Sequence, residues 1–214
     1  MAMGTYRKSV ATMVQQDIAG RGIRDQRVLE AVASVDRKQF VPKALEDAAY
    51  DDRALPIAGG QTISQPYIVA LMAEHLRLKG TDTVLDIGTG SGYAAAVLSQ
   101  LAGRVISVEC IAELAQSAKA RLEHLGYDTI QVCQGDGALG CKKYAPYDAI
   151  HVAAAAPSVP DALYQQLKVG GRMILPIGPP GHVQMLKLII RQEENCWQEE
   201  DILPVRFVPL VAAM

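Results

Sequence analysis

The stretch TVLDIGTGSGY, residues 83–93, carries the most information about the architecture of the chain. It begins with a short run rich in β-branched residues, as expected for a buried strand, and continues into a glycine-rich turn. Gly88, Gly90 and Gly92 allow the backbone to turn tightly and to come close to a ligand. The alanine-rich sequence that follows predicts a helix, whose free N–H groups and positive dipole end favour a polar ligand.

Short β-branched runs and helix-like stretches alternate downstream of this loop. The alternation predicts a parallel sheet with helices on both faces. Residues 182–191 and 202–210 resemble two further strands with no helix between them, so we expect an antiparallel C-terminal edge. The predicted class is α/β: a Rossmann-like, doubly wound three-layer α/β/α sandwich with an N-terminal helical addition. The strands expected in the parallel part are residues 83–87, 104–109, 129–134, 148–153 and 172–178.

Glu109 ends the second of these strands, about twenty residues beyond the glycine loop, where a carboxylate can accept both hydrogen bonds of a ribose diol. Strand, loop, helix and acid together predict a nucleoside site. A dinucleotide fingerprint would need glycine or alanine at position 93, where this chain has Tyr93. The G-x-G-x-G spacing therefore argues against a pyrophosphate cofactor, and it resembles the loop of S-adenosylmethionine-dependent methyltransferases.

Asp136 follows the third predicted strand, at the same edge of the sheet as the glycine loop. In a methyltransferase, Asp136 and the backbone of Gly137 would hold the amino edge of adenine. An ordinary Asp-Gly turn is the alternative interpretation. The loop and the acid already described favour the nucleoside role.

The segment ahead of the loop predicts helices. Residues 6–19 and 25–35 place apolar side chains at helical spacing, with Asp25 as the expected N-cap, and a further helical pattern starts at Pro66. We expect a single domain over residues 1–214. Its expected parts are a helical addition with a substrate-side loop (1–65), a cofactor-binding core (66–178) and C-terminal strands (179–214).

The 214 residues include 21 lysines and arginines and 23 aspartates and glutamates, which gives a net charge of −2. This balance offers no electrostatic reason to expect a nucleic-acid or membrane partner. The first residues, MAMGTYRKSV, lack the apolar core of a signal peptide, and no apolar run approaches the roughly 20 residues that span a bilayer. We expect a cytoplasmic monomer. Four cysteines and four histidines without metal-binding spacing give no support to a metal site.

A longer set of motifs, spread from Arg24 to Leu210, closely resembles protein-L-isoaspartate O-methyltransferases. Two of them, GGQTISQP (59–66) and HVAAAAPSVP (151–160), are signatures of that family rather than of methyltransferases in general. In order, the motifs are DRKQFVP, AYDDRALPIAGGQTISQPYIVALM, VLDIGTGSGYAAAVL, GDG, YDAIHVAAAAPSVPDALYQQLKVGGRMILPIG and VRFVPL.

The resemblance implies a repair enzyme that uses S-adenosyl-L-methionine and acts on isoaspartyl-containing proteins and peptides. Aspartyl and asparaginyl residues rearrange spontaneously, through a succinimide, into isoaspartyl linkages. Methylation of the misplaced α-carboxylate lets the ester expel methanol and re-form the succinimide, so repeated cycles return part of the damage to aspartate.

The resemblance also implies a site, with Ser64 as the catalytic residue. The acceptor carboxylate is already ionised at neutral pH, so it needs no general base and has only to be held in line with the methyl group. Neutral donors suit this task, because a cation would make the carboxylate a poorer nucleophile. The local pattern alone favours Ser64 as the N-cap of the helix near Pro66, whereas the resemblance favours the active-site role, and the two roles are compatible. The implied cofactor-binding residues are Gln61, Thr62, Ile63, Ser64, Asp86, Gly88, Gly90, Ser91, Gly92, Glu109, Asp136 and Gly137.

Other polar residues are expected to have structural roles. Asp148 should anchor the start of the fourth strand, and His151 should pack near the acceptor pocket. Asp51 and Asp52 are expected to be solvated in a turn. Some relatives continue further after the VPL motif, so a cofactor contact near Val211 is left open.

Two alternative functions remain at this point. One is a methyltransferase of the same fold that acts on a small molecule or on RNA, although RNA would require a basic face. The other is a protein that binds the cofactor without catalysis, which would be recognised by cofactor binding without methylation of any peptide.

Overall fold

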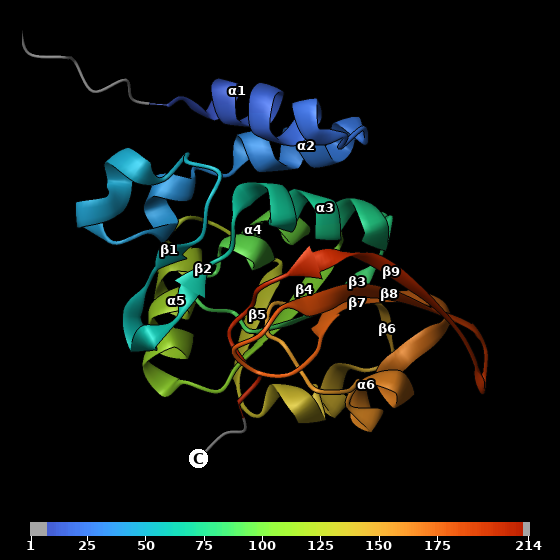
Figure 1. The fold of residues 1–214 in the computed structure, drawn as a ribbon. Coiled ribbons are helices and arrows are strands. Elements are labelled where there is room, and N and C mark those ends of the chain that lie inside the picture. Colours follow the sequence, from blue (N-terminus) through green and yellow to red (C-terminus); the bar gives the residue numbers. More distant parts are fainter. Residues whose placement is uncertain (1–7, 212–214) are drawn as a thin grey trace, which may run out of the picture.

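The computed structural model describes residues 8–211 of the chain. Its centre is a seven-stranded sheet with the strand order β5-β4-β3-β6-β7-β8-β9 (Figure 1). Pairing is parallel from β5 to β7 and antiparallel between β7, β8 and β9, which confirms the expected α/β class and its antiparallel edge. The strands are β3 (Thr83–Ile87), β4 (Arg104–Glu109), β5 (Ile130–Gln134), β6 (Tyr147–Val152), β7 (Leu167–Ile177), β8 (Gln184–Glu193) and β9 (Cys196–Val205).

Helices cover both faces of this sheet because the side chains of each strand alternate between two apolar cores. Val84 and Val105 belong to the core beneath the helices α2, α3 and α4, whereas Leu85 and Ile106 belong to the opposite core, which includes Leu163 of α6. The helix α5 packs against β4 and β5. The helices are α2 (Gln26–Ser34), α3 (Pro66–Leu76), α4 (Tyr93–Ser99), α5 (Ala112–His124) and α6 (Asp161–Gln166).

The N-terminal helices lie over α3, on one side of the sheet (Figure 1). The helix expected at residues 6–19 is a short α-helix, α1 (Val10–Thr12), followed by a π-helical segment (Met13–Ile18) and a 3₁₀ turn (Ala19–Arg21). The first two residues of that expected helix, 6 and 7, lie outside the described residues. Asp25 is the N-cap of α2, as expected, because its carboxylate accepts a hydrogen bond from the backbone N–H of Arg27 at 3.0 Å. Two further 3₁₀ segments follow, at Arg37–Phe40 and Lys43–Ala48.

A small hairpin precedes α3 and projects over the end of the sheet. Its strands are β1 (Leu55–Pro56) and β2 (Thr62–Ile63), which pair antiparallel. Gly59 and Gly60, with φ angles of 65° and 67°, form the turn between them in a conformation that L side chains rarely adopt. The glycine pair in the sequence is therefore explained by the hairpin that carries residues 61–64.

The bounds of two expected strands differ clearly in the structure. The strand expected at residues 172–178 is β7, which already begins at Leu167, because that residue pairs with Tyr147 of β6. The last strand occupies Cys196–Val205 rather than residues 202–210, because it forms a long hairpin with β8. Residues 206–210 leave that hairpin and run beside Ala155 instead.

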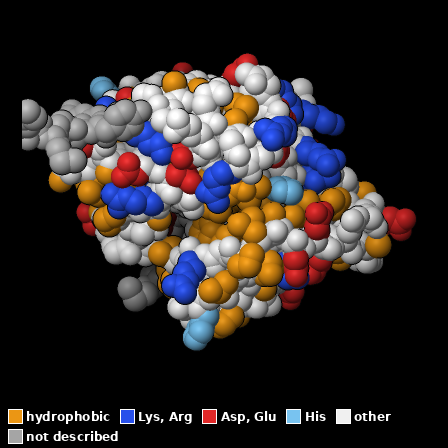
Figure 2. Space-filling view, turned by 45° about the horizontal axis from the view of Figure 1, so that its top comes forward, with side chains coloured by type: hydrophobic (Ala, Val, Ile, Leu, Met, Phe, Trp, Pro, Cys, Tyr) orange, Lys and Arg blue, Asp and Glu red, His pale blue; other side chains and the backbone are white. Residues whose placement is uncertain are grey.

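Hydrophobic side chains gather beside a hollow on one face of the molecule, with Lys and Arg side chains around them (Figure 2). Among residues 8–211, no helix combines the length and the hydrophobicity needed to cross a bilayer.

Candidate active site

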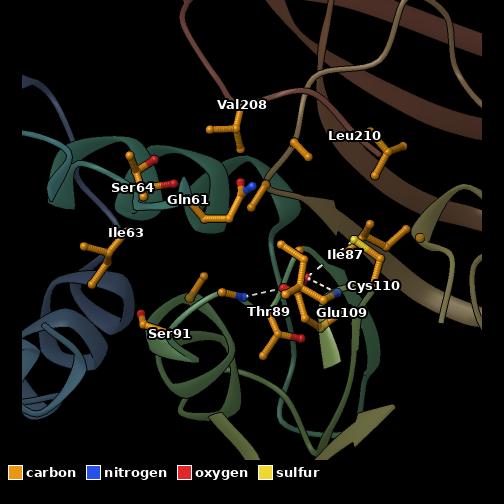
Figure 3. Close-up of a pocket in the computed structure, with 18 of the residues that line it drawn as sticks. Gln61, Ile63, Ser64, Ile87, Thr89, Ser91, Glu109, Cys110, Val208 and Leu210 are labelled. Carbon is orange, nitrogen blue, oxygen red and sulfur yellow. Dashed lines mark hydrogen bonds between the residues drawn. The ribbon is translucent and has the colours of Figure 1, made fainter. Parts of the chain in front are cut away.

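A cavity of about 720 Å³, its open mouth included, lies where β3 and β4 end. The residues around it come from distant parts of the chain (Figure 3). Gln61 and Ser64 stand on one side, Glu109 and Cys110 on another, and Leu210 comes from the C-terminal segment. This is the edge at which ligands bind in open α/β sheets.

The glycine loop reaches this cavity through Gly88, Gly90 and Ser91 but not through Gly92. Gly92 has a φ angle of 91°, and a Cβ there would lie 3.2 Å from Leu122 of α5. Gly92 therefore allows the turn and the close approach of α5.

Glu109 binds the glycine loop and also lines the cavity. One of its carboxylate oxygens accepts a hydrogen bond from Gly90 N at 2.8 Å, and the other accepts one from Ile111 N at 3.0 Å. The oxygen bound to Ile111 N also accepts a weak bond from Cys110 Sγ at 3.6 Å, whereas the oxygen bound to Gly90 N has no other donor in the described chain. Glu109 can therefore hold its own loop and still bind a ligand hydroxyl. The structure thus brings Glu109 and the glycine loop together, as the sequence predicted.

Asp86 is fully buried inside the sheet and does not line the cavity. Its carboxylate accepts hydrogen bonds from His151 Nδ1 at 2.7 Å and from Ser107 Oγ at 2.6 Å. Because the only Ser107 hydroxyl proton goes to Asp86, the Thr89 hydroxyl donates to Ser107 Oγ, at 2.6 Å. Asp86 therefore supports the glycine loop through Ser107 and Thr89. His151 also lies here, inside the sheet, rather than at an acceptor pocket.

Asp136 and Gly137 have different roles in the structure. Asp136 accepts a hydrogen bond from Ala138 N at 2.8 Å and so caps the 3₁₀ turn Gly137–Leu139. Gly137 lines the cavity, whereas Asp136 does not. A Cβ at position 137 would collide with Ile87, so only glycine fits this approach of backbone to cavity. One oxygen of Asp136 therefore has the turn role, and a contact of Asp136 with the cofactor stays a prediction.

The hairpin residues Gln61, Thr62, Ile63 and Ser64 all line the cavity. Within the described chain, the Ser64 hydroxyl forms no hydrogen bond to protein, so it is available to a ligand. The capping role considered for Ser64 is wrong, because the N-cap residue of α3 is Gln65 and its side chain makes no capping bond.

Asp52 satisfies the start of α3 instead, by accepting a hydrogen bond from Tyr67 N at 3.0 Å. It also accepts bonds from Gln65 Nε2 and Arg21 Nη1, both at 2.7 Å, and its side chain is only 14% exposed. The expectation of a solvated Asp52 is therefore wrong. Asp51, by contrast, is 42% exposed and pairs with Arg53.

Arg37 holds the backbone of Ser64 although it does not line the cavity itself. It is fully buried, and it donates hydrogen bonds to the carbonyl oxygens of Ser64 at 2.9 Å and Ala49 at 2.8 Å. Its guanidinium carbon also lies 4.9 Å from the centre of the Tyr93 ring. Burial lowers the pKa of Arg37 to about 10, although Tyr93 and Asp52 act in the opposite direction. Sequence analysis assigned Arg37 no role, because its partners are backbone atoms distant in the chain.

A second cavity adjoins the first and shares Thr62 and Ser64 with it. It lies between the start of α3 and the end of β9. Ser64 therefore stands at the junction of two hollows.

The C-terminal segment 208–211 is a wall that sequence analysis did not predict. Ala155 N donates to Val208 O at 2.8 Å, and Leu210 N donates to Ala155 O at 2.7 Å, so this segment is held beside the run of small residues. The side chains of Ala153 and Ala154 also line the cavity. Val211, whose contact was left open, is part of the lining.

A family model of protein-L-isoaspartate(D-aspartate) O-methyltransferases matches residues 8–214. A protein-L-isoaspartate O-methyltransferase 2 of Pelobacter propionicus is 52% identical over 208 residues, which are 97% of this chain and 92% of that protein. A protein-L-isoaspartate O-methyltransferase 1 of Geotalea uraniireducens is 54% identical over 201 residues, covering 94% of this chain and 92% of the relative.

Solved structures agree with this match. A protein-L-isoaspartate O-methyltransferase superposes with a TM-score of 0.87 at 29% identity, over 96% of this chain and 67% of the other. A Plasmodium falciparum protein, solved in complex with S-adenosyl-L-homocysteine, has the same fold, with a TM-score of 0.82 at 24% identity over 95% of this chain and 99% of that one.

Proposed function

The chain belongs to the protein-L-isoaspartate(D-aspartate) O-methyltransferase family, and we propose how its residues perform the reaction of that family. It is an enzyme that uses S-adenosyl-L-methionine to methylate isoaspartyl residues in damaged proteins. One observation carries the assignment of the site: the free hydroxyl of Ser64 and the carboxylate of Glu109 line the same cavity as the glycine loop.

The chemistry of the cavity fits the cofactor. Glu109 offers carboxylate oxygens to a ribose diol, and Gly88 and Gly137 line the cavity with backbone alone. Ile111 and Leu210 offer apolar surface suited to a purine ring. When bound, the cofactor supplies an electrophilic methyl group on a sulfonium. We assign direct contacts to Gln61, Thr62, Ile63, Ser64, Gly88, Gly90, Ser91, Glu109 and Gly137, and supporting roles to Asp86, Gly92 and Asp136.

Ser64 holds the acceptor in our proposal. Its hydroxyl would donate a hydrogen bond to one oxygen of the isoaspartyl α-carboxylate and so orient the other oxygen toward the methyl group that the cofactor supplies. No residue has to accept a proton, because the carboxylate is ionised at neutral pH. The neutral rim of residues 61–64 keeps the nucleophile uncompensated, so that it stays reactive. The methyl ester can then cyclise to the succinimide with loss of methanol.

A paired-peptide assay tests the function. Two peptides that differ only in one isoaspartyl or aspartyl linkage are incubated with labelled S-adenosyl-L-methionine, and incorporation of label is measured. We expect the isoaspartyl peptide to accept the methyl group and its aspartyl twin to remain unlabelled. Equal labelling of both would refute the specificity, and cofactor binding without any labelling would favour a protein without catalysis. The single domain, the cytoplasmic location and the monomeric state remain predictions, and light scattering would check the last of them.

A further inference from the structure

The second cavity continues from the point where the acceptor is held. It shares Thr62 and Ser64 with the first cavity, so a peptide whose isoaspartyl residue reaches Ser64 has this hollow beside it. Apolar side chains, among them Ile68 and Phe207, form much of its lining. Among the described lining residues, two carry a positive charge and none carries a negative one.

The two cations, Arg21 and Arg206, are not equivalent. Arg21 donates to the carboxylate of Asp52 at 2.7 Å and stacks on Tyr67, with 3.6 Å from its guanidinium carbon to the ring centre. Its charge is therefore already compensated. Arg206 is exposed and directly follows β9, and within residues 8–211 no hydrogen bond or ion pair engages it. Arg206 is thus the uncompensated charge of this cavity.

We infer that the second cavity binds the residues next to the isoaspartyl linkage, and that Arg206 makes it prefer an anionic group there. The inference rests on the proposed function and adds a substrate preference to it. A guanidinium matches a carboxylate in shape and can form two parallel hydrogen bonds with it. Apolar neighbours reduce the screening of such a pair by water. The anion is either an acidic side chain or the C-terminal carboxylate of a short peptide.

The two cavities offer different surroundings to two carboxylates of the substrate. The reacting carboxylate lies against the neutral rim at Ser64, where no cation among the described lining residues of the first cavity lowers its nucleophilicity. The second, unreactive carboxylate meets the cation. Arg206 therefore contributes to substrate binding rather than to the chemical step, and its effect should fall on KM.

Peptide series provide the test. Each series has a central isoaspartyl residue, blocked termini, and glutamate, glutamine or lysine at one position, moved along both sides of the linkage. We expect at least one position at which KM is lower for glutamate than for glutamine by about two- to fivefold, the usual range for an exposed ion pair, and highest for lysine. High salt should reduce this difference. A matched pair of peptides with a free or an amidated C-terminus shows whether a terminal carboxylate can replace the acidic side chain.

Variants connect the preference to the residue. Arg206→Gln should abolish the difference between the glutamate and glutamine peptides, and Arg206→Lys should restore part of it. Arg104→Gln is the control, because Arg104 is an exposed arginine at the amino end of β4 that lines neither cavity; it should keep the full preference.

Equal KM values for the three peptides at every position would overturn this inference, and so would a preference that survives in Arg206→Gln. Either result leaves the proposed function intact as long as isoaspartyl peptides are methylated and aspartyl twins are not. If no isoaspartyl peptide is methylated, both the function and the inference fail.

Discussion

Arg37 Nη1 lies 2.9 Å from the carbonyl oxygen of Ser64 and donates a hydrogen bond to it. The same guanidinium donates to Ala49 O at 2.8 Å and lies over the ring of Tyr93, at the start of α4. One buried cation thus connects the N-terminal helical region, the hairpin that carries Ser64 and the helix after the glycine loop. The position of the Ser64 hydroxyl therefore depends on a residue that does not line either cavity.

Replacing Arg37 should reduce both stability and turnover. We expect Arg37→Gln to lower the free energy of unfolding by about 2–4 kcal/mol, because buried carbonyl groups lose their donors. It should also lower kcat of the folded enzyme, because the Ser64 backbone loses its anchor. Urea unfolding and steady-state kinetics well below the melting temperature measure the two effects. Arg172→Gln is a matched control, since Arg172 donates to the carbonyl of His75 at 3.0 Å and lines neither cavity; it should affect stability alone. Wild-type kcat in Arg37→Gln would contradict the positioning role.

Removing the Ser64 hydroxyl should slow the reaction without weakening cofactor binding. We expect Ser64→Ala to reduce kcat about ten- to a hundredfold. This effect is at or just below the roughly hundred- to thousandfold fall in kcat that follows the loss of one preorganised donor. The affinity for S-adenosyl-L-homocysteine, measured by calorimetry, should change little. Ser99→Ala removes a hydroxyl that donates to Ala96 O at 2.7 Å in α4, and it should keep full activity. Full turnover in Ser64→Ala would remove Ser64 from the mechanism.

The carboxylate of Glu109 should determine cofactor affinity. Glu109→Ala loses the acceptor for a ribose and also the bonds to Gly90 N and Ile111 N. Because hydrogen bonds to a charged group contribute about 1.5–3 kcal/mol, the dissociation constant of S-adenosyl-L-homocysteine should rise at least tenfold. Glu113→Gln, at an exposed position in the first turn of α5, is the control and should bind normally. Unchanged affinity in Glu109→Ala would show that the nucleoside lies elsewhere.

Acid should remove a contribution that Asp148 makes to stability. Burial raises the pKa of Asp148, but the Lys168 ammonium at 2.7 Å and the Thr83 N–H at 2.8 Å outweigh it and hold the pKa below its ordinary value. The unfolded state therefore binds this proton more readily than the folded state. The contribution is complete above about pH 4, the range of an unperturbed aspartate, and is lost as the pH falls through the lower folded pKa. In urea unfolding between pH 2 and pH 7, Asp148→Asn and Lys168→Gln should each show a shallower loss of stability in acid. An unchanged slope in both variants would contradict this role.

The sheet and the glycine loop could be predicted because their signals are local. The β-branched runs and the spacing of Gly88, Gly90 and Gly92 need no knowledge of distant residues. The same is true of Glu109, whose place follows from the end of its own strand. Such features depend on backbone geometry within one strand–loop–helix unit.

Contacts between distant segments could not be predicted in this way. Asp86 meets His151 because β3 and β6 pair in a register that sets these two residues side by side, and no local pattern reveals that register. Asp52 replaces Ser64 at the start of α3 from 15 positions away along the chain from the N–H that it accepts. In both cases the role of the aspartate depends on partners from distant segments, which no local pattern reveals.

The wall formed by residues 208–211 bears on what truncation would do to the protein. All seven strands of the sheet precede this segment along the chain, so it adds no strand to the sheet. Without it the pocket lacks one side, and Ala155 lacks the two backbone bonds that it makes with Val208 and Leu210. We therefore expect a premature stop codon just ahead of this segment to yield a sheet without a repair function.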